Sequence, residues 1–217
     1  MKIMKKILII LMMGLVVLPF SVKADEKTYN TLNFDQTLSE EEIEHDFSNY
    51  KETDDQITIY MFRGKGCGYC RKFLTFLNSI VDDYGKYFKL ESYEVWATEN
   101  KDNADLMQNV ATFMNERADG VPFIIIGDKV FSGYTESYDD DIKSAIKELY
   151  ETKKDKRYDV MDAYNNQKDD SDVSNVSIIV FNIIIAGALA LAVAIYDSKK
   201  RIDLENRISN LENSKRK

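Results

Sequence analysis

The order of apolar and polar positions divides residues 55–152 into strand-like and helix-like segments. Residues 57–62 predict a buried strand, because β-branched and aromatic side chains follow one another without a breaking residue. Residues 87–96 predict a second strand, and residues 119–134 predict two short strands joined by a Gly-Asp turn. Apolar side chains at helical spacing predict three helices: one from Cys67 onward, one over 103–117 and one over 137–150. This order predicts one α/β domain, for which about a hundred residues supply enough core.

The chain before this domain is expected to contain a targeting segment and a polar extension. Residues 1–24 combine a basic start, an apolar run of eleven residues and small residues at the end, which is typical of a cleaved signal peptide. A membrane span needs about twenty apolar residues, so an uncleaved anchor is the less favoured alternative. Residues 25–54 form an acidic extension, which we expect to lie over the edge of the sheet. Within it, Ser39-Glu40-Glu41-Glu42 resembles a capping box that opens a short helix.

The chain after the domain predicts a membrane anchor. Residues 153–175 form a charged spacer, expected to be helical at first and flexible by its end. Residues 176–196 carry no formal charge and, as a helix, would span roughly 30 Å, the thickness of the hydrocarbon core. In residues 197–217, seven Lys or Arg outnumber four Asp or Glu. The positive-inside rule therefore places this tail in the cytoplasm and the domain outside it, at a cell membrane crossed once.

The charge balance excludes some partners. The whole chain has a formal net charge of −8, and residues 25–196 alone carry about −15 because both flanking segments are basic. Such an acidic domain argues against nucleic acid as a partner and against an anionic membrane surface.

The two cysteines of the chain lie in a single C-x-x-C, Cys67-Gly68-Tyr69-Cys70, where the first predicted strand turns into the first helix. At a helix N-terminus, free N–H groups and the positive end of the dipole favour thiolate at Cys67. Three neighbouring cations, Lys65, Arg71 and Lys72, should add to this effect. Cys70, one turn further in, should be more buried and able to attack a mixed disulfide formed at Cys67.

Two other interpretations of the cysteine pair are less favoured. A structural zinc site needs four ligands, and the chain offers two cysteines and one distant histidine, His45, which we expect to point to water. A structural disulfide across four residues would constrain the unfolded chain little and so stabilise it weakly. We therefore expect redox chemistry that uses no metal and no organic cofactor.

A second motif, Val121-Pro122, comes just before the third predicted strand. Together with Cys67-Gly68-Tyr69-Cys70 after a strand, it resembles the thioredoxin superfamily over residues 55–152. The resemblance implies a mixed central sheet flanked by helices. It also implies that Pro122 is cis and lies against the cysteine pair, and that the Val121 backbone pairs with an extended substrate peptide. Gly68 and Tyr69 would then form the variable pair that supports the site.

This chain departs from the thioredoxin pattern at three places. Met61 stands where thioredoxins proper often have a buried acid, Gly66 stands where they usually have tryptophan, and Gly68-Tyr69 replaces Gly-Pro. The Val-Pro pair looks more like the oxidant branch of the superfamily. These departures favour an oxidant or isomerase slightly over a reductase and leave the direction of electron flow open. We assign no role to Trp96.

The combined features predict a membrane-tethered thiol–disulfide oxidoreductase that acts on cysteines of exported proteins, most simply at a bacterial cell surface. A redox partner, which the sequence does not identify, would reset the cysteine pair. The leading alternative is an accessory module that keeps the fold to dock a membrane or secretion partner without essential redox chemistry. The two hypotheses differ in whether replacing Cys67 and Cys70 together abolishes function.

Overall fold

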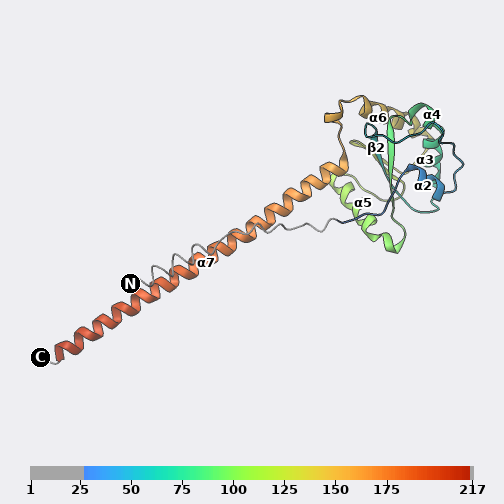
Figure 1. Ribbon diagram of the computed structural model, residues 1–217. Helices are drawn as coiled ribbons and strands as arrows, with labels where there is room; N and C mark the ends of the chain where they lie inside the picture. The colour runs from blue at the N-terminus through green and yellow to red at the C-terminus, as the bar shows by residue number, and fades with distance from the viewer. Residues whose placement is uncertain (1–26, 216–217) are drawn as a thin grey trace.

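The computed structural model describes residues 27–215, so the expected signal peptide lies outside the described residues. A long helix extends from an α/β domain in Figure 1. In chain order, the elements are β1 (Thr31–Leu32), α2 (Phe34–Glu40), β2 (Ile57–Arg63), α3 (Gly68–Ser79), α4 (Val81–Tyr84), β3 (Phe88–Glu94), η1 (Thr98–Asn100), α5 (Lys101–Phe113), β4 (Phe123–Ile126), β5 (Lys129–Ser132), η2 (Glu136–Tyr138), α6 (Asp139–Glu151), η3 (Lys154–Lys156) and α7 (Val160–Lys215). The strands and helices expected between residues 55 and 152 are confirmed, with ends shifted by a few residues.

The five strands form one mixed sheet in the order β1-β3-β2-β4-β5. The central strand β2 runs parallel to β3 and antiparallel to β4, and the two edge strands pair antiparallel with their neighbours. A parallel pair needs a crossover between its strands, and α3 and α4 provide it. The expected mixed sheet flanked by helices is therefore confirmed.

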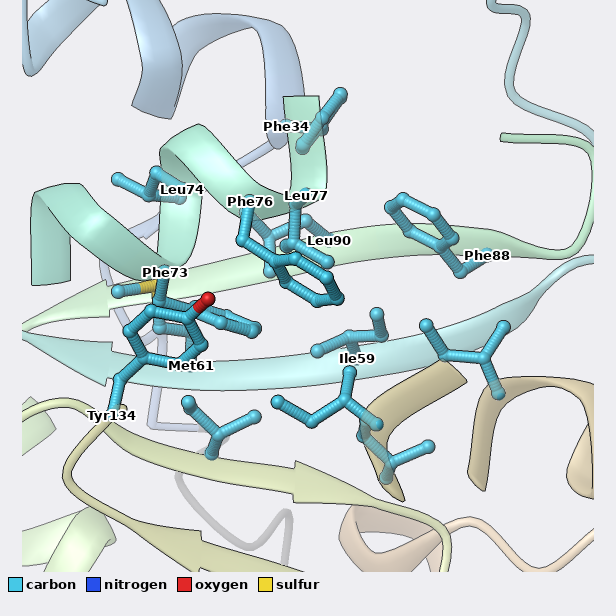
Figure 2. Packing of buried hydrophobic residues seen from close by; sticks show 14 of the residues in the cluster. Phe34, Ile59, Met61, Phe73, Leu74, Phe76, Leu77, Phe88, Leu90 and Tyr134 are labelled. Atoms are coloured by element: carbon cyan, nitrogen blue, oxygen red, sulfur yellow. The ribbon is translucent and has the colours of Figure 1, made fainter. Parts of the chain in front are cut away.

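Helices cover both faces of the sheet, and this explains why β2 is apolar without alternation. Ile59 and Met61 point into a core formed with α2, α3 and α6, part of which Figure 2 shows. Tyr60 and Phe62 point into a second core formed with α5 and the start of α7. Successive strand residues face opposite sides, so a strand buried on both faces has to be apolar at both sets of positions.

The N-terminal extension belongs to the domain more closely than the sequence predicted. It supplies the edge strand β1, and the fully buried Phe34 of α2 packs edge-on against Phe88 of β3, with 5.7 Å between ring centroids. The expected capping box is wrong, because residues 39–42 lie at the end of α2. Asn33 caps the helix instead, since its side chain accepts a hydrogen bond of 3.0 Å from the Gln36 N–H.

The segment after the domain also differs from expectation. The chain from 153 to 159 forms a short 3-10 turn and a loop, and α7 (Val160–Lys215) then continues as one helix, so the spacer is not helical at its start as expected. Asp159 caps α7 by accepting hydrogen bonds from the backbone N–H groups of Met161 and Asp162. The buried Val160 fixes the first turn in the second core. Once the first turn is fixed, each further residue of the helix adds one backbone hydrogen bond. This accounts for the helical structure of the polar segment that follows Val160.

One helical segment among the described residues, Phe181–Asn210, is long and apolar enough to cross a membrane. It overlaps the expected span, residues 176–196. Its large apolar side chains are exposed, as Phe181 and Tyr196 illustrate. This exposure is what a lipid-facing helix requires and is unlike a helix in the core of a soluble domain.

Candidate redox site

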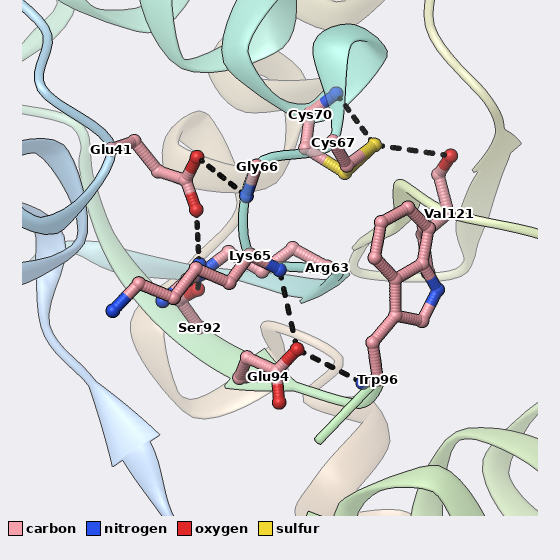
Figure 3. Close-up of a disulfide and its surroundings, with 10 residues drawn as sticks. All are labelled: Glu41, Arg63, Lys65, Gly66, Cys67, Cys70, Ser92, Glu94, Trp96 and Val121. Atoms are coloured by element: carbon pink, nitrogen blue, oxygen red, sulfur yellow. Dashed lines mark hydrogen bonds and ion pairs between the residues drawn. A yellow bond between two sulfur atoms is a disulfide. The ribbon is translucent and has the colours of Figure 1, made fainter.

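Cys67 and Cys70 form a disulfide at the N-terminus of α3, with 5.2 Å between their Cα atoms. Cys67 is the N-cap residue of this helix, and its Sγ lies 3.2 Å from the Cys70 N–H, which donates to it (Figure 3). Cys67 is 6% exposed and Cys70 is fully buried, as the sequence predicted. The two cysteines therefore differ in burial: Cys67 keeps a small exposed fraction, and Cys70 has none.

The second motif lies against the first. The Val121-Pro122 peptide bond is cis, and the Val121 carbonyl oxygen lies 3.8 Å from Cys67 Sγ. Pro122 is buried, and its carbonyl accepts a hydrogen bond from the Gly133 N–H. The other two expected site residues, Gly68 and Tyr69, are exposed on the outer side of the first turn of α3. The structure thus brings all six expected site residues together.

Beneath the pair, the fully buried Met61 belongs to the same apolar core as Cys70. A methionine there cannot accept a proton, so this position supplies no base for the Cys70 thiol. Polar side chains surround the nearby loop that connects β2 to α3, and the sequence did not predict this arrangement.

Glu94, at the end of β3, holds one side of this loop. Its carboxylate accepts hydrogen bonds from the Lys65 N–H at 3.2 Å and the Trp96 N–H at 2.9 Å (Figure 3). The Ala97 N–H and the Asn100 amide donate to it as well, at 3.0 and 2.7 Å. Burial raises the pKa of Glu94, but these hydrogen bonds outweigh burial and leave the pKa below its ordinary value. Glu94 is therefore a charged anchor for the loop.

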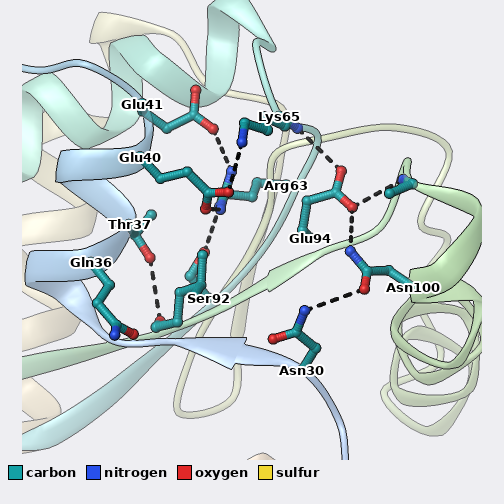
Figure 4. Close-up of polar contacts among 12 residues, drawn as sticks. Asn30, Gln36, Thr37, Glu40, Glu41, Arg63, Lys65, Ser92, Glu94 and Asn100 are labelled. Carbon is teal, nitrogen blue, oxygen red and sulfur yellow. Dashed lines mark hydrogen bonds and ion pairs between the residues drawn. The ribbon is translucent and has the colours of Figure 1, made fainter.

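Glu41, from the end of α2, holds the other side. It forms an ion pair with Arg63, and its second oxygen lies 3.4 Å from the Gly66 N–H. The Arg63 side chain is fully buried and also contacts Glu40 and the Ser92 hydroxyl (Figure 4). The acidic composition of the extension was visible in the sequence, but no spacing rule pairs residues that lie 22 positions apart.

Trp96 covers the start of the loop. Its indole lies against Gly64, where a Cβ atom would come within 2.0 Å of the ring. Figure 3 shows the indole between Glu94 and Val121, beside the disulfide. It is 61% exposed, although tryptophan is usually well buried. An aromatic ring therefore borders the site, supplied by the segment after β3, and no sequence signal indicated this role.

The charges around the pair differ in part from expectation. Lys65 forms an ion pair with Glu40 at 3.0 Å, so its effect on Cys67 is weaker than predicted. Arg71 and Lys72 are exposed on α3, and Lys72 Nζ lies 5.8 Å above the Tyr69 ring. The positive charge at the start of α3 that has no acidic partner among the described residues therefore comes from these two residues and the helix N-terminus.

Within residues 27–215, no group of three or more His, Cys, Asp or Glu side chains could hold a metal ion. His45 is exposed, as expected, and stacks on Phe47 with 4.1 Å between ring centroids. No protein-family model, curated protein or solved structure matches the chain. The resemblance to the thioredoxin superfamily therefore stays a prediction.

Proposed function

We propose that this protein exchanges thiols and disulfides with cysteines of exported proteins, through Cys67 and Cys70 of a thioredoxin-like domain. The observation that carries the proposal is the asymmetry of the pair at the N-terminus of α3. Cys67 keeps a small exposed fraction, 6%, and accepts a hydrogen bond from the Cys70 N–H, whereas Cys70 is fully buried. A sulfur that can be attacked and a neighbour that resolves the intermediate are the two parts that such exchange needs.

The reaction balances without any further cofactor. A substrate thiolate attacks Cys67 Sγ, the Cys67–Cys70 bond breaks, and the bond's electron pair leaves with Cys70 Sγ, which takes up a proton. A second substrate thiolate then attacks the substrate sulfur of the mixed disulfide and releases Cys67. The substrate has lost two electrons and two protons, and the protein holds a dithiol. A disulfide on a redox partner reoxidises this dithiol by the same steps, and the reverse sequence would reduce a substrate.

The surroundings of Cys67 favour disulfide donation. The helix N-terminus, the Cys70 N–H, Arg71 and Lys72 all stabilise negative charge on Cys67 Sγ. A stabilised thiolate favours the reduced protein, and a pair whose reduced form is stabilised is the stronger oxidant.

The same proposal includes a location. The helix that is long and apolar enough to cross a membrane would anchor the domain, and the excess of Lys and Arg in residues 197–217 would keep that end in the cytoplasm. The redox domain would then lie outside the cytoplasm, where protein disulfides persist.

Trapping of the mixed disulfide tests the proposal. In cells that express the full chain, Cys70→Ser should accumulate disulfide-linked adducts with exported proteins, because the residue that resolves them is gone. Cys67→Ser is the matched control and should form none, because its remaining thiol is buried. Absence of reducible adducts with Cys70→Ser would contradict the proposal and favour a docking module.

A further inference from the structure

The last part of α7 presents an apolar face that no described residue covers. Leu204 is 47% exposed and Ile208 is 56% exposed, on a helix that extends far from the α/β domain (Figure 1). They lie four residues apart, and in the sequence Leu211 follows after three more. Alternating intervals of four and three residues are typical of the seam at which two helices meet in a coiled coil. In the heptad notation abcdefg, Leu204 and Leu211 occupy d positions and Ile208 occupies an a position.

The charges that flank this seam complement those of a second, parallel copy. Lys200 and Arg207 occupy g positions, and Glu205 and Glu212 occupy e positions. In a parallel pair, each g residue faces the e residue that comes five positions later in the other chain. Lys200 would therefore face the second copy's Glu205, and Arg207 would face its Glu212. Lys200, Glu205 and Arg207 form no ion pair with any residue that the structure describes, so their charges are available for such contacts.

The membrane anchor determines how two copies can meet. If the chain crosses the membrane once, as proposed above, α7 has the same direction in every copy, so neighbouring copies can pair only in parallel. Isoleucine at a and leucine at d favour two helices over three or four in parallel coiled coils. Anchoring in one membrane also raises the effective concentration of the second copy, which a short seam needs.

The same face continues into the apolar part of α7. At the same heptad spacing it carries Gly187, Ala190 and Ala194, and small residues let two helices approach closely in a membrane. Between the two parts, Asp197 and Arg201 occupy successive d and a positions. In a pair, each would lie one layer away from the opposite charge of the other copy, so the two charges compensate each other. The face is therefore compatible with close approach from Gly187 onward.

We propose that two copies of this chain pair in parallel through this face of α7. Leu204 and Ile208 pack between the two helices, and Lys200 of each copy forms an ion pair with Glu205 of the other. The parallel orientation depends on the proposed membrane crossing but not on the redox activity, so the two can be tested separately. Pairing would hold two redox domains on the same side of the membrane.

Disulfide cross-linking of the full chain in lipid vesicles tests the proposal. Cys67→Ser and Cys70→Ser are combined, so that one added cysteine is the only cysteine in the chain. Arg201→Cys places it at an a position, where two copies would bring their cysteines within disulfide reach. Lys199→Cys is the matched control, because it also replaces an exposed cation but at the outward f position. A large excess of lipid over protein keeps chance encounters rare, and copper phenanthroline provides the oxidant.

We expect Arg201→Cys to cross-link about tenfold faster than Lys199→Cys. Adding Lys200→Glu or Glu205→Lys to Arg201→Cys should slow cross-linking about tenfold, because each change places like charges opposite each other on both sides of the seam. A mixture of these two charge variants should recover the rate, since opposite charges then face each other again.

Equal cross-linking rates at positions 199 and 201 would overturn the proposal, and so would charge variants that leave the rate unchanged. Cross-linking at neither position would also overturn it. The occupant of this face would then be a lipid surface or a different protein.

Discussion

The buried ion pair beside the loop that connects β2 to α3 allows a quantitative test with two adjacent glutamates. Both contact Arg63, whose side chain is fully buried, but the Glu41 side chain is 1% exposed and the Glu40 side chain is 30% exposed. Replacing either by Gln removes one charge and almost no volume. The two substitutions therefore compare a buried partner with a partly exposed partner of the same arginine.

Glu41→Gln should lower the free energy of unfolding by about 3 kcal/mol, because it removes the buried charge that compensates the Arg63 guanidinium. Glu40→Gln should cost about 1 kcal/mol, since water screens this carboxylate and Glu41 remains. In the Glu41→Gln variant, the new amide oxygen could still accept a hydrogen bond from the Gly66 N–H, so the difference reports mainly on charge.

Urea unfolding of the full chain in detergent provides the measurement. Fluorescence of Trp96, the only tryptophan in the chain, follows the domain, and circular dichroism serves as a second probe. The two variants should differ by about 2 kcal/mol at equal slope. Equal costs for the two variants, or a cost below about 1 kcal/mol for Glu41→Gln, would refute the idea that this pair is buried.

Three further predictions concern the site. In the reduced protein, iodoacetamide should modify Cys67 before Cys70, because Cys67 keeps a small exposed fraction and Cys70 has none; mass spectrometry of both sites would reveal equal labelling if this is wrong. Gly64→Ala should displace the Trp96 indole from the loop and increase the quenching of its fluorescence by acrylamide. Gly120→Ala is the control and should not change the quenching, because its Cβ would meet nothing within 4 Å. Equal quenching in the two variants would disprove the contact between Trp96 and Gly64. The pKa of Glu94 is lower in the folded state than in the unfolded state, so the stability that its carboxylate contributes is present above about pH 4.3 and is lost as pH falls through the folded pKa. In acid unfolding curves, Glu94→Gln should therefore reduce the loss of stability over this pH range. An unchanged pH dependence in the variant would count against a stabilising role of the Glu94 carboxylate.

The parts of the domain that could be predicted are those in which a local sequence pattern determines the structure. β-Branched and aromatic residues from 57 to 62, without a breaking residue, predicted a buried strand, and helices on both faces of the sheet account for its mostly apolar side chains. The C-x-x-C between a strand and a helix predicted Cys67 at the helix N-terminus and a more buried Cys70, since position along the first turn determines burial there.

The groups around the loop were not predictable, because their contacts join residues distant in the sequence. Glu41 reaches Arg63 only after β1 joins the edge of the sheet and brings α2 over β3. The capping-box prediction failed for a related reason, as its acidic residues end α2 and turn toward the arginine. Trp96 covers Gly64, a residue that lies far from it in the sequence, so this contact depends on tertiary structure.

The central claim is that Cys67 and Cys70 exchange with external thiols, and a redox titration of the full chain tests it most directly. The purified protein would be equilibrated in glutathione or dithiothreitol buffers, and the fraction of dithiol would be counted by alkylation and mass spectrometry. We expect one two-electron transition, with a potential closer to about −120 mV, as in strong disulfide donors, than to about −270 mV, as in thioredoxin. A pair that stays oxidised or reduced in every buffer, without equilibrating, would contradict the account.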